Sequence, residues 1–262
     1  MDDTSPPTAA DLGISDIEYE RIVRDLQRRG RGEQPEPVAP DRERRSRRVP
    51  VVVLTLVVVV TLLTRLGGGG DKPSYAFLET VAGHPVTYSS CHPIQVAIYP
   101  AGGPPDAEQL VRDAVAELRG ATGLDIVVTG VFGGHAPNWN FKAGPVRPDD
   151  PISVSWQDGA AIAELTDHVA GVGGSRVMDG RNGGKLYVAG TIALSREYFA
   201  GVYASHDHGK AMAVLLHEFG HVFGLAHVSS RHELMYKSVT DLTTFGPGDL
   251  QGLRLLGQGP CV

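Results

Sequence analysis

The sequence predicts an α+β domain that begins near residue 75 and is preceded by a single transmembrane helix. Two apolar periodicities in residues 75–262 indicate the domain: alternate residues in short segments, as in strands, and every third or fourth residue in longer ones, as in helices. An uncharged run, Val49–Thr64, indicates the membrane helix. The 262-residue chain is 42% hydrophobic and 21% charged, which suits one sizeable folded domain with accessory segments.

Residues 1–48 predict a largely disordered tail. They contain 10 arginines and 11 acidic residues together with five prolines, a composition that cannot bury much apolar surface. Residues 14–29 place apolar side chains near helical spacing, so this part is either a marginal solvated helix or a helix that binds a partner. The chain carries a net charge of -6 and has no strongly basic region, which argues against a nucleic-acid partner.

The apolar run predicts a transmembrane signal-anchor over residues 49–66. Its sixteen uncharged residues span about 24 Å as a helix, somewhat less than the ~30 Å hydrocarbon core. Snorkelling of Arg65 and inclusion of the following glycines extend it. The alternatives are a cleaved signal peptide, which the 48 preceding residues disfavour, and a buried soluble element.

Arginines predict the orientation of this helix. The segment "DRERRSRR" precedes it, whereas Arg65 and Lys72 follow it. Positive residues stay in the cytoplasm, so we expect a single-pass protein of the cell membrane with a cytoplasmic N-terminus and an extracellular domain. Cleavage after the apolar run would instead give a secreted protein. Residues 67–74 contain four consecutive glycines and are predicted to be a flexible linker.

Residues 75–262 predict the elements of the folded domain in the following order. Alternation of apolar residues predicts a strand over 92–100, helical periodicity predicts an amphipathic helix over 106–120 ended by Gly120, and further strands follow over 124–132 and 152–156. Glycine-rich loops are predicted over 171–184, then a strand over 185–195, a buried helix over 209–224 and a last helix over 248–257.

The two cysteines, Cys91 and Cys261, both lie in the part predicted to be extracellular. An oxidising environment favours a disulfide between them, which would tie the start of the domain to its end. Two unrelated buried thiols are the alternative.

The stretch "HEFGHVFGLAH" predicts a metal site. On a helix, His217 and His221 lie on one face, one turn apart, and Gly224 permits the sharp helix end that brings His227 back as a third ligand. Three protein ligands leave one position open for water, as in catalytic zinc sites. Glu218 projects beside the first ligand. The five-residue pattern occurs by chance in many proteins, but the longer spacing is far more restrictive, and a buried helix has no packing reason for these polar groups.

These residues resemble the active site of metzincin zinc endopeptidases, and in particular of the matrixin family. The spacing H-E-x-x-H-x-x-G-x-x-H is the metzincin signature. Eight residues after His227, Met235 in "ELMY" is similar to the Met-turn beneath the zinc. The resemblance covers about residues 90–257. It implies a metzincin-like catalytic domain with a mixed twisted sheet, an active-site helix and a C-terminal helix.

The resemblance implies an enzyme that hydrolyses peptide bonds of extracytoplasmic proteins. One catalytic Zn²⁺ would be bound by His217, His221 and His227, and Glu218 would act as general base toward a zinc-activated water. A catalytically silent binding or signalling module is the alternative, with the N-terminal tail as its contact to a cytoplasmic partner. Retention of Glu218 and all three histidines favours the enzyme.

Three departures from the family's pattern stand out. No cysteine switch is evident, because only Cys91 precedes the motif, within the predicted domain. Ligands for structural calcium or a second zinc cannot be matched, since Asp167 and His168 stand alone, so neither ion is predicted. Lys237 follows Tyr236 where matrixins typically have proline, and no fifth ligand is expected.

Overall fold

The computed structural model describes residues 74–134, 147, 149–165, 169–180, 184–238 and 240–261. In this part of the chain, five strands form one mixed sheet. They are β3 (Ile94–Tyr99), β4 (Ile126–Val131), β5 (Ile152–Gln157), β6 (Gly171–Asp179) and β7 (Lys185–Ser195). Their order is β4-β3-β5-β7-β6. Strand β6 is an edge strand that runs antiparallel to β7, and the remaining neighbours are parallel.

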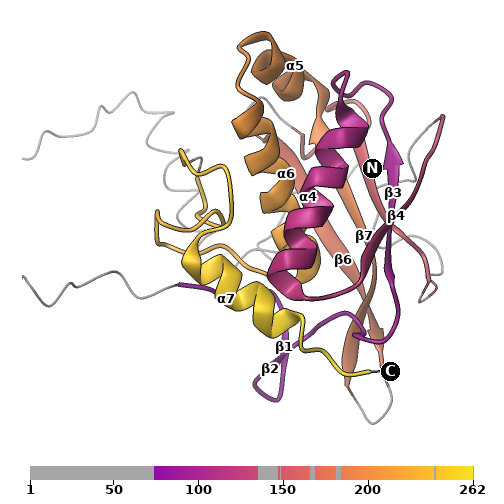
Figure 1. Ribbon diagram of the computed structural model, residues 1–262, viewed down its shortest axis with the longest axis vertical. Helices are drawn as coiled ribbons and strands as arrows, with labels where there is room; N and C mark the ends of the chain where they lie inside the picture. Colours follow the sequence, from indigo (N-terminus) through magenta and orange to yellow (C-terminus); the bar gives the residue numbers. More distant parts are fainter. Residues whose placement is uncertain are drawn as a thin grey trace, which may run out of the picture. The chain divides into compact units, whose positions relative to one another are not determined.

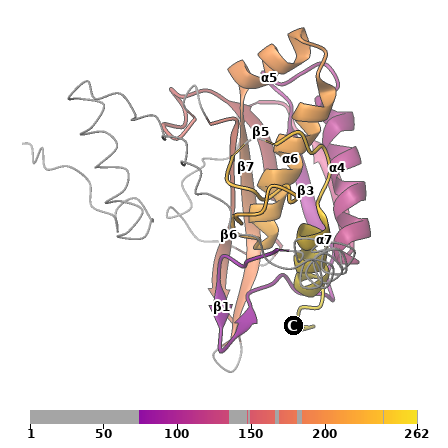
Figure 2. The same ribbon diagram turned by 90° about the vertical axis from the view of Figure 1, so that its left-hand side faces the viewer.

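The helices of the described residues are α4 (Ala107–Thr122), α5 (Arg196–Ala204), α6 (His208–Phe223) and α7 (Pro247–Leu256). Helices α4 and α6 lie side by side on one face of the sheet, and α7 packs against both (Figures 1 and 2). Between the sheet and these helices lies the hydrophobic core. The short hairpin of β1 (Thr80–Val81) and β2 (His84–Pro85) precedes β3. The prediction of an α+β domain is confirmed.

The apolar patterns that predicted the helices correspond to their buried faces. Helix α4 buries residues at three-to-four spacing and exposes the others, so it covers the sheet with one face. Helix α6 is predominantly apolar and packs against β6, β7, α4, α5 and α7. It therefore lies in the centre of the helical layer, as its composition predicted, and its polar residues Glu218 and His221 need an explanation other than solvation.

The prediction of loops over residues 171–184 was wrong for the first nine of them. Gly171–Asp179 form strand β6, which pairs with β7 along its length. Glycine has a low intrinsic preference for strands, but pairing across the sheet overrides that preference here. Strand β6 is also the strand that packs most extensively against α6.

Two helix predictions also need correction. Helix α4 passes through Gly120 and ends at Gly123, which has φ 74° and donates its N–H to the carbonyl of Arg119. A glycine inside a helix costs only about 1 kcal/mol, so it weakens the helix without ending it. Helix α5 was not predicted. Its start has a typical N-cap residue, Ser195, whose hydroxyl accepts a hydrogen bond from the N–H of Tyr198.

The structure joins Cys91 and Cys261 in a disulfide across 170 residues. The predicted tail, the membrane helix over 49–66 and nearly all of the linker lie outside the described residues, and they stay predictions. Among the described residues, no helix has both the length and the apolar character needed to cross a membrane.

Candidate active site

Helix α6 carries the predicted metal ligands, and both of its ends are defined by the sequence. Asp207 caps the N-terminus, where its carboxylate accepts a hydrogen bond from the N–H of Lys210 at 3.2 Å. Gly224 ends the helix with φ 112°, a left-handed conformation that favours glycine. The chain then reverses, which brings His227 to His217 and His221, as predicted.

Backbone carbonyls orient the two imidazoles of α6. The Nδ1 atom of His217 lies 2.8 Å from the carbonyl oxygen of Leu234, and that of His221 lies 2.9 Å from the carbonyl oxygen of Leu225. A carbonyl only accepts, so each Nδ1 carries the proton and each Nε2 has a free lone pair. Both rings therefore present a metal-binding nitrogen in one direction, a support common around metal-ligating histidines.

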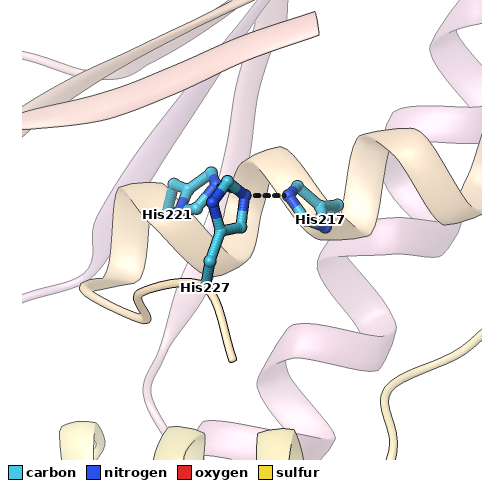
Figure 3. A group of neighbouring side chains, drawn as sticks. All are labelled: His217, His221 and His227. Carbon is cyan, nitrogen blue, oxygen red and sulfur yellow. Dashed lines mark hydrogen bonds between the residues drawn. The ribbon is translucent and has the colours of Figure 1, made fainter. Parts of the chain in front are cut away.

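The three histidines converge on one point (Figure 3). The Nε2 atom of His227 lies 3.1 Å from that of His217 and 3.2 Å from that of His221. Nitrogens bound tetrahedrally to zinc at about 2.05 Å are separated by about 3.3 Å, so the arrangement fits such an ion. Within the described part of the chain, this is the group of His, Cys, Asp and Glu side chains placed closely enough to hold a metal ion.

Burial adjusts the protonation of two ligands. Desolvation is the largest cause that lowers the pKa of His217 to about 4 and the pKa of His221 to about 3, and neighbouring imidazoles contribute to both of these values. Both rings are therefore neutral at pH 7. Metal binding needs neutral imidazoles, so the site is ready for a cation without first losing protons.

Glu218 lies beside the triad and is not a member of it. Its side chain is 6% exposed and borders the same cleft as the three histidines. Desolvation raises the pKa of this carboxyl to about 8 in the metal-free protein. A carboxyl next to a metal site whose pKa lies near neutral pH is suited to proton transfer.

Met235 occupies the position predicted for the Met-turn. It is fully buried and packs against Gly220, where any added Cβ would collide with its sulfur atom. The carbonyl of Met235 accepts a hydrogen bond from the N–H of Val228 at 2.9 Å. This turn thus lies beneath α6 and is fastened to the residue after His227.

The prediction missed two buried carboxylates that support this turn. Asp249, in the first turn of α7 and 0% exposed, accepts hydrogen bonds from the N–H groups of Leu234, Met235 and Gly246. Glu233, 2% exposed, accepts from the N–H groups of Ser74, Gly248 and Asp249. Burial raises the pKa of Asp249 to about 6, although these hydrogen bonds oppose the rise. An acidic residue two positions after Pro247 was the available signal, since it is typical of a helix start.

The remaining histidines of the described residues lie apart from the triad. His208 is the first residue of α6, lies 3.9 Å from the carboxylate of Asp106, and packs edge-on against Tyr203. His206 precedes the helix with φ 59°. Asp167 and His168 lie outside the described residues, so the expectation of no structural metal ion stays a prediction.

The cleft beside the triad has a volume of about 440 Å³. Its walls are the start of β6, the exposed side of α6, and the chain from Leu234 to Leu242. Residues 169–173, at the start of β6, border this cleft.

Part of this sequence is similar to a known family. Residues 150–254 match the sequence profile of a peptidase family, M10, described as matrixin. These 105 residues are similar to matrixins. The predicted resemblance is thereby confirmed over a range that includes the triad, Glu218 and Met235. A matrixin-like domain with three convergent histidines supports a zinc metallopeptidase.

Solved structures with similarity to this chain include two archaemetzincins and a bacterial metalloproteinase. Archaemetzincin from Methanopyrus kandleri shares 14% identity at a TM-score of 0.40, over 63% of this chain and 94% of its own. Archaemetzincin from Archaeoglobus fulgidus shares 14% identity at 0.37, over 61% and 99%. Metalloproteinase-II from Bacteroides fragilis shares 19% identity at 0.37, over 72% and 59%. A search of curated proteins finds no significant sequence match.

Proposed function

We propose that this protein is a zinc-dependent endopeptidase that hydrolyses peptide bonds of extracytoplasmic proteins. The observation that carries the proposal is the convergence of three imidazole Nε2 atoms beside the buried side chain of Glu218, in one cleft. His217, His221 and His227 would hold one zinc ion. When bound, zinc supplies a Lewis acid next to the scissile carbonyl.

Glu218 performs the proton transfers in the proposed reaction. A carboxylate oxygen of Glu218 takes a proton from the attacking water as the new C–O bond forms, and returns it to the amine nitrogen as the C–N bond breaks. Burial raises the pKa of the Glu218 carboxyl, whereas a nearby cation lowers that pKa. These opposing effects keep the group able both to accept and to donate near neutral pH.

The cleft suits an extended polypeptide. It follows α6 beside β6, which is an edge strand of the sheet in the described residues. An edge strand can pair with an added extended peptide. The side chains of Ala213, Val214 and Leu242 give part of the cleft an apolar lining, and Lys210 also borders it. An apolar lining with a few polar groups is typical of sites that bind organic substrates.

We further propose that the peptidase is anchored in the cell membrane, with the domain outside the cytoplasm. The uncharged run over residues 49–64 and the arginines before it support this placement. The disulfide supports an oxidising environment for the domain. Mass spectrometry of the membrane fraction tests the proposal: a chain with an intact N-terminus supports the anchor, whereas a chain starting near residue 67 in the medium supports a secreted form.

The activity is tested with the full-length chain on an unfolded protein and on a peptide library. We expect cleavage by the wild type that a zinc chelator abolishes and added zinc restores, and background cleavage by Glu218→Ala. If the wild type binds one equivalent of zinc but cleaves no more than Glu218→Ala, the enzyme proposal fails. That result would favour the silent binding module.

A further inference from the structure

The start of strand β6 forms a row of small residues that faces helix α6. Gly171, Gly173 and Ser175 alternate along the strand, so they point to the same side of the sheet. All three meet α6: the two glycines at Glu218 and the serine at Val222. Val172 points to the opposite side, where it packs against a separate apolar cluster.

The two glycines allow the strand to contact Glu218 directly. A Cβ atom at Gly171 would lie 2.9 Å from Cγ and 3.3 Å from Cδ of Glu218. At Gly173 it would lie 2.6 Å from the carbonyl oxygen of Glu218 and 3.1 Å from its Cβ. Neither glycine has a positive φ, so close approach, rather than backbone conformation, requires glycine here.

Ser175 fixes the spacing between the strand and the helix. Its hydroxyl donates a hydrogen bond to the carbonyl of Val222 at 2.6 Å and lies 2.6 Å from the hydroxyl of Tyr88. The tyrosine therefore donates to the serine. Val222 lies one helical turn beyond Glu218, so this bond holds β6 against the part of α6 that carries the site.

We propose that Gly171 and Gly173 are positioning residues that place the carboxylate of Glu218, with the Ser175–Val222 bond holding the strand in register. The inference rests on the proposed role of Glu218 in proton transfer. Proton transfer requires heavy atoms within about 2.6–3.2 Å, and a displacement of about 1 Å typically lowers the rate about 100-fold. The backbone of β6 is one wall that limits where the carboxylate can go.

Substitution of the two glycines by alanine should have different effects on catalysis and folding. Alanine at residue 171 meets the end of the Glu218 side chain and Cδ2 of Leu194, both of which are side-chain atoms that can move aside, so the protein folds but the carboxylate is displaced. Alanine at residue 173 meets the backbone of α6 and forces strand and helix apart. Gly171→Ala therefore changes catalysis with little effect on folding, whereas Gly173→Ala changes both.

The test compares full-length Gly171→Ala with two controls, Gly120→Ala in α4 and Gly201→Ala in α5. An added Cβ has no neighbour within 4 Å at either control position. We expect Gly171→Ala to lower kcat about 10- to 100-fold, with KM within about threefold and one bound zinc retained, and the controls to keep the wild-type kcat. An unchanged kcat for Gly171→Ala would overturn the proposal.

A further variant separates positioning from general damage. Ser175→Ala adds no atoms and should lower kcat about three- to tenfold with zinc retained, so it serves if the glycine variants fold poorly. An unchanged rate in Ser175→Ala counts against the proposal.

A crystal structure of zinc-loaded Gly171→Ala gives a readout that is independent of activity. We expect the Cδ atom of Glu218 to move by about 1 Å, while the three histidines stay in place. An unmoved carboxylate overturns the positioning role even if the wild type cleaves peptides. Conversely, a wild type that cleaves nothing overturns the proposed function, whereas displacement of Glu218 in the variant still supports the structural relationship.

Discussion

His217 and Asp249 are hydrogen bonded to the same residue, Leu234. The imidazole of His217 donates from Nδ1 to the carbonyl of Leu234, and the N–H of Leu234 donates to the carboxylate of Asp249. Asp249 belongs to α7 and His217 to α6, so Leu234 connects the two helices through the turn that contains Met235. A buried carboxylate thus supports the orientation of a metal ligand from outside the metal site.

Asp249→Asn tests this connection. The asparagine amide keeps the shape but directs N–H₂ toward backbone N–H groups, which leaves buried donors without an acceptor. We expect the free energy of unfolding to fall by about 1–3 kcal/mol and zinc affinity to fall about 10- to 100-fold. Denaturant unfolding at pH 8 and competitive zinc titration measure the two effects.

Asp113→Asn is the matched control. Asp113 is an exposed residue of α4 whose carboxylate accepts a hydrogen bond from Gln109. Its substitution should change stability by less than about 0.5 kcal/mol and leave zinc affinity unchanged. If Asp249→Asn binds zinc as tightly as this control, Leu234 does not transmit support to His217.

Gly224→Ala and Gly123→Ala form a second matched pair. Each glycine ends a helix in the left-handed region, with φ 112° and 74°. An added Cβ at Gly123 meets nothing within 4 Å, whereas at Gly224 it would lie 2.9 Å from Cε2 of Tyr187. We expect Gly123→Ala to cost about 1 kcal/mol with zinc binding intact. Gly224→Ala should cost about 2–4 kcal/mol and weaken zinc binding at least about tenfold, because it displaces the turn to His227. Equal zinc affinity in the two variants would contradict this role of Gly224.

Removal of the disulfide should lower the stability of the domain and leave the metal site intact. Cys91 and Cys261 close a loop of 170 residues, and neither borders the cleft of the triad. The double variant Cys91→Ser/Cys261→Ser should lose about 3–5 kcal/mol, mainly because its unfolded chain is less constrained. Urea unfolding with and without a reductant measures this loss. A wild type whose unfolding midpoint is unaffected by reduction would contradict the prediction, and zinc content provides the control for the intact site.

Local spacing in the sequence was enough to predict which histidines meet. Helix geometry puts His217 and His221 on one face, and Gly224 permits the reversal that returns His227. The strands over residues 94–99 and 185–195 were likewise predictable. Burial of one face gives alternating apolar residues and burial of both faces gives a continuous apolar run, and either pattern can be read locally.

The supporting residues could not be predicted in the same way. Strand β6 contains three glycines in its first four residues, and only its pairing with β7 and its contact with α6 make it a strand. Asp249 lies 15 residues from Leu234, with no local pattern that connects them. Both relationships depend on how distant elements pack, which a single sequence does not contain in readable form.

Glu218→Gln should stabilise the metal-free protein by an amount that depends on pH. Burial raises the pKa of Glu218 to about 8, from 4.5 in the unfolded chain. Between these two values the unfolded chain loses the proton while the folded protein keeps it. The stability contributed by the protonated group is therefore complete below pH 4.5 and is lost progressively as the pH rises through 8. Glutamine cannot ionise and avoids this loss.

We expect the melting temperatures of metal-free Glu218→Gln and the wild type to be similar at pH 4.5 and to diverge up to about pH 8, with the variant higher. The corresponding difference in the free energy of unfolding should reach a few kcal/mol, because it grows by at most on the order of 1.4 kcal/mol per pH unit. Zinc should reduce the difference, because a cation favours the carboxylate. Glu164→Gln, at an exposed position, is the control and should show no comparable divergence. Parallel melting curves for Glu218→Gln and the wild type across this range would mean that the carboxyl of Glu218 is not desolvated in the folded protein, and would remove the physical basis for its proton affinity near neutral pH.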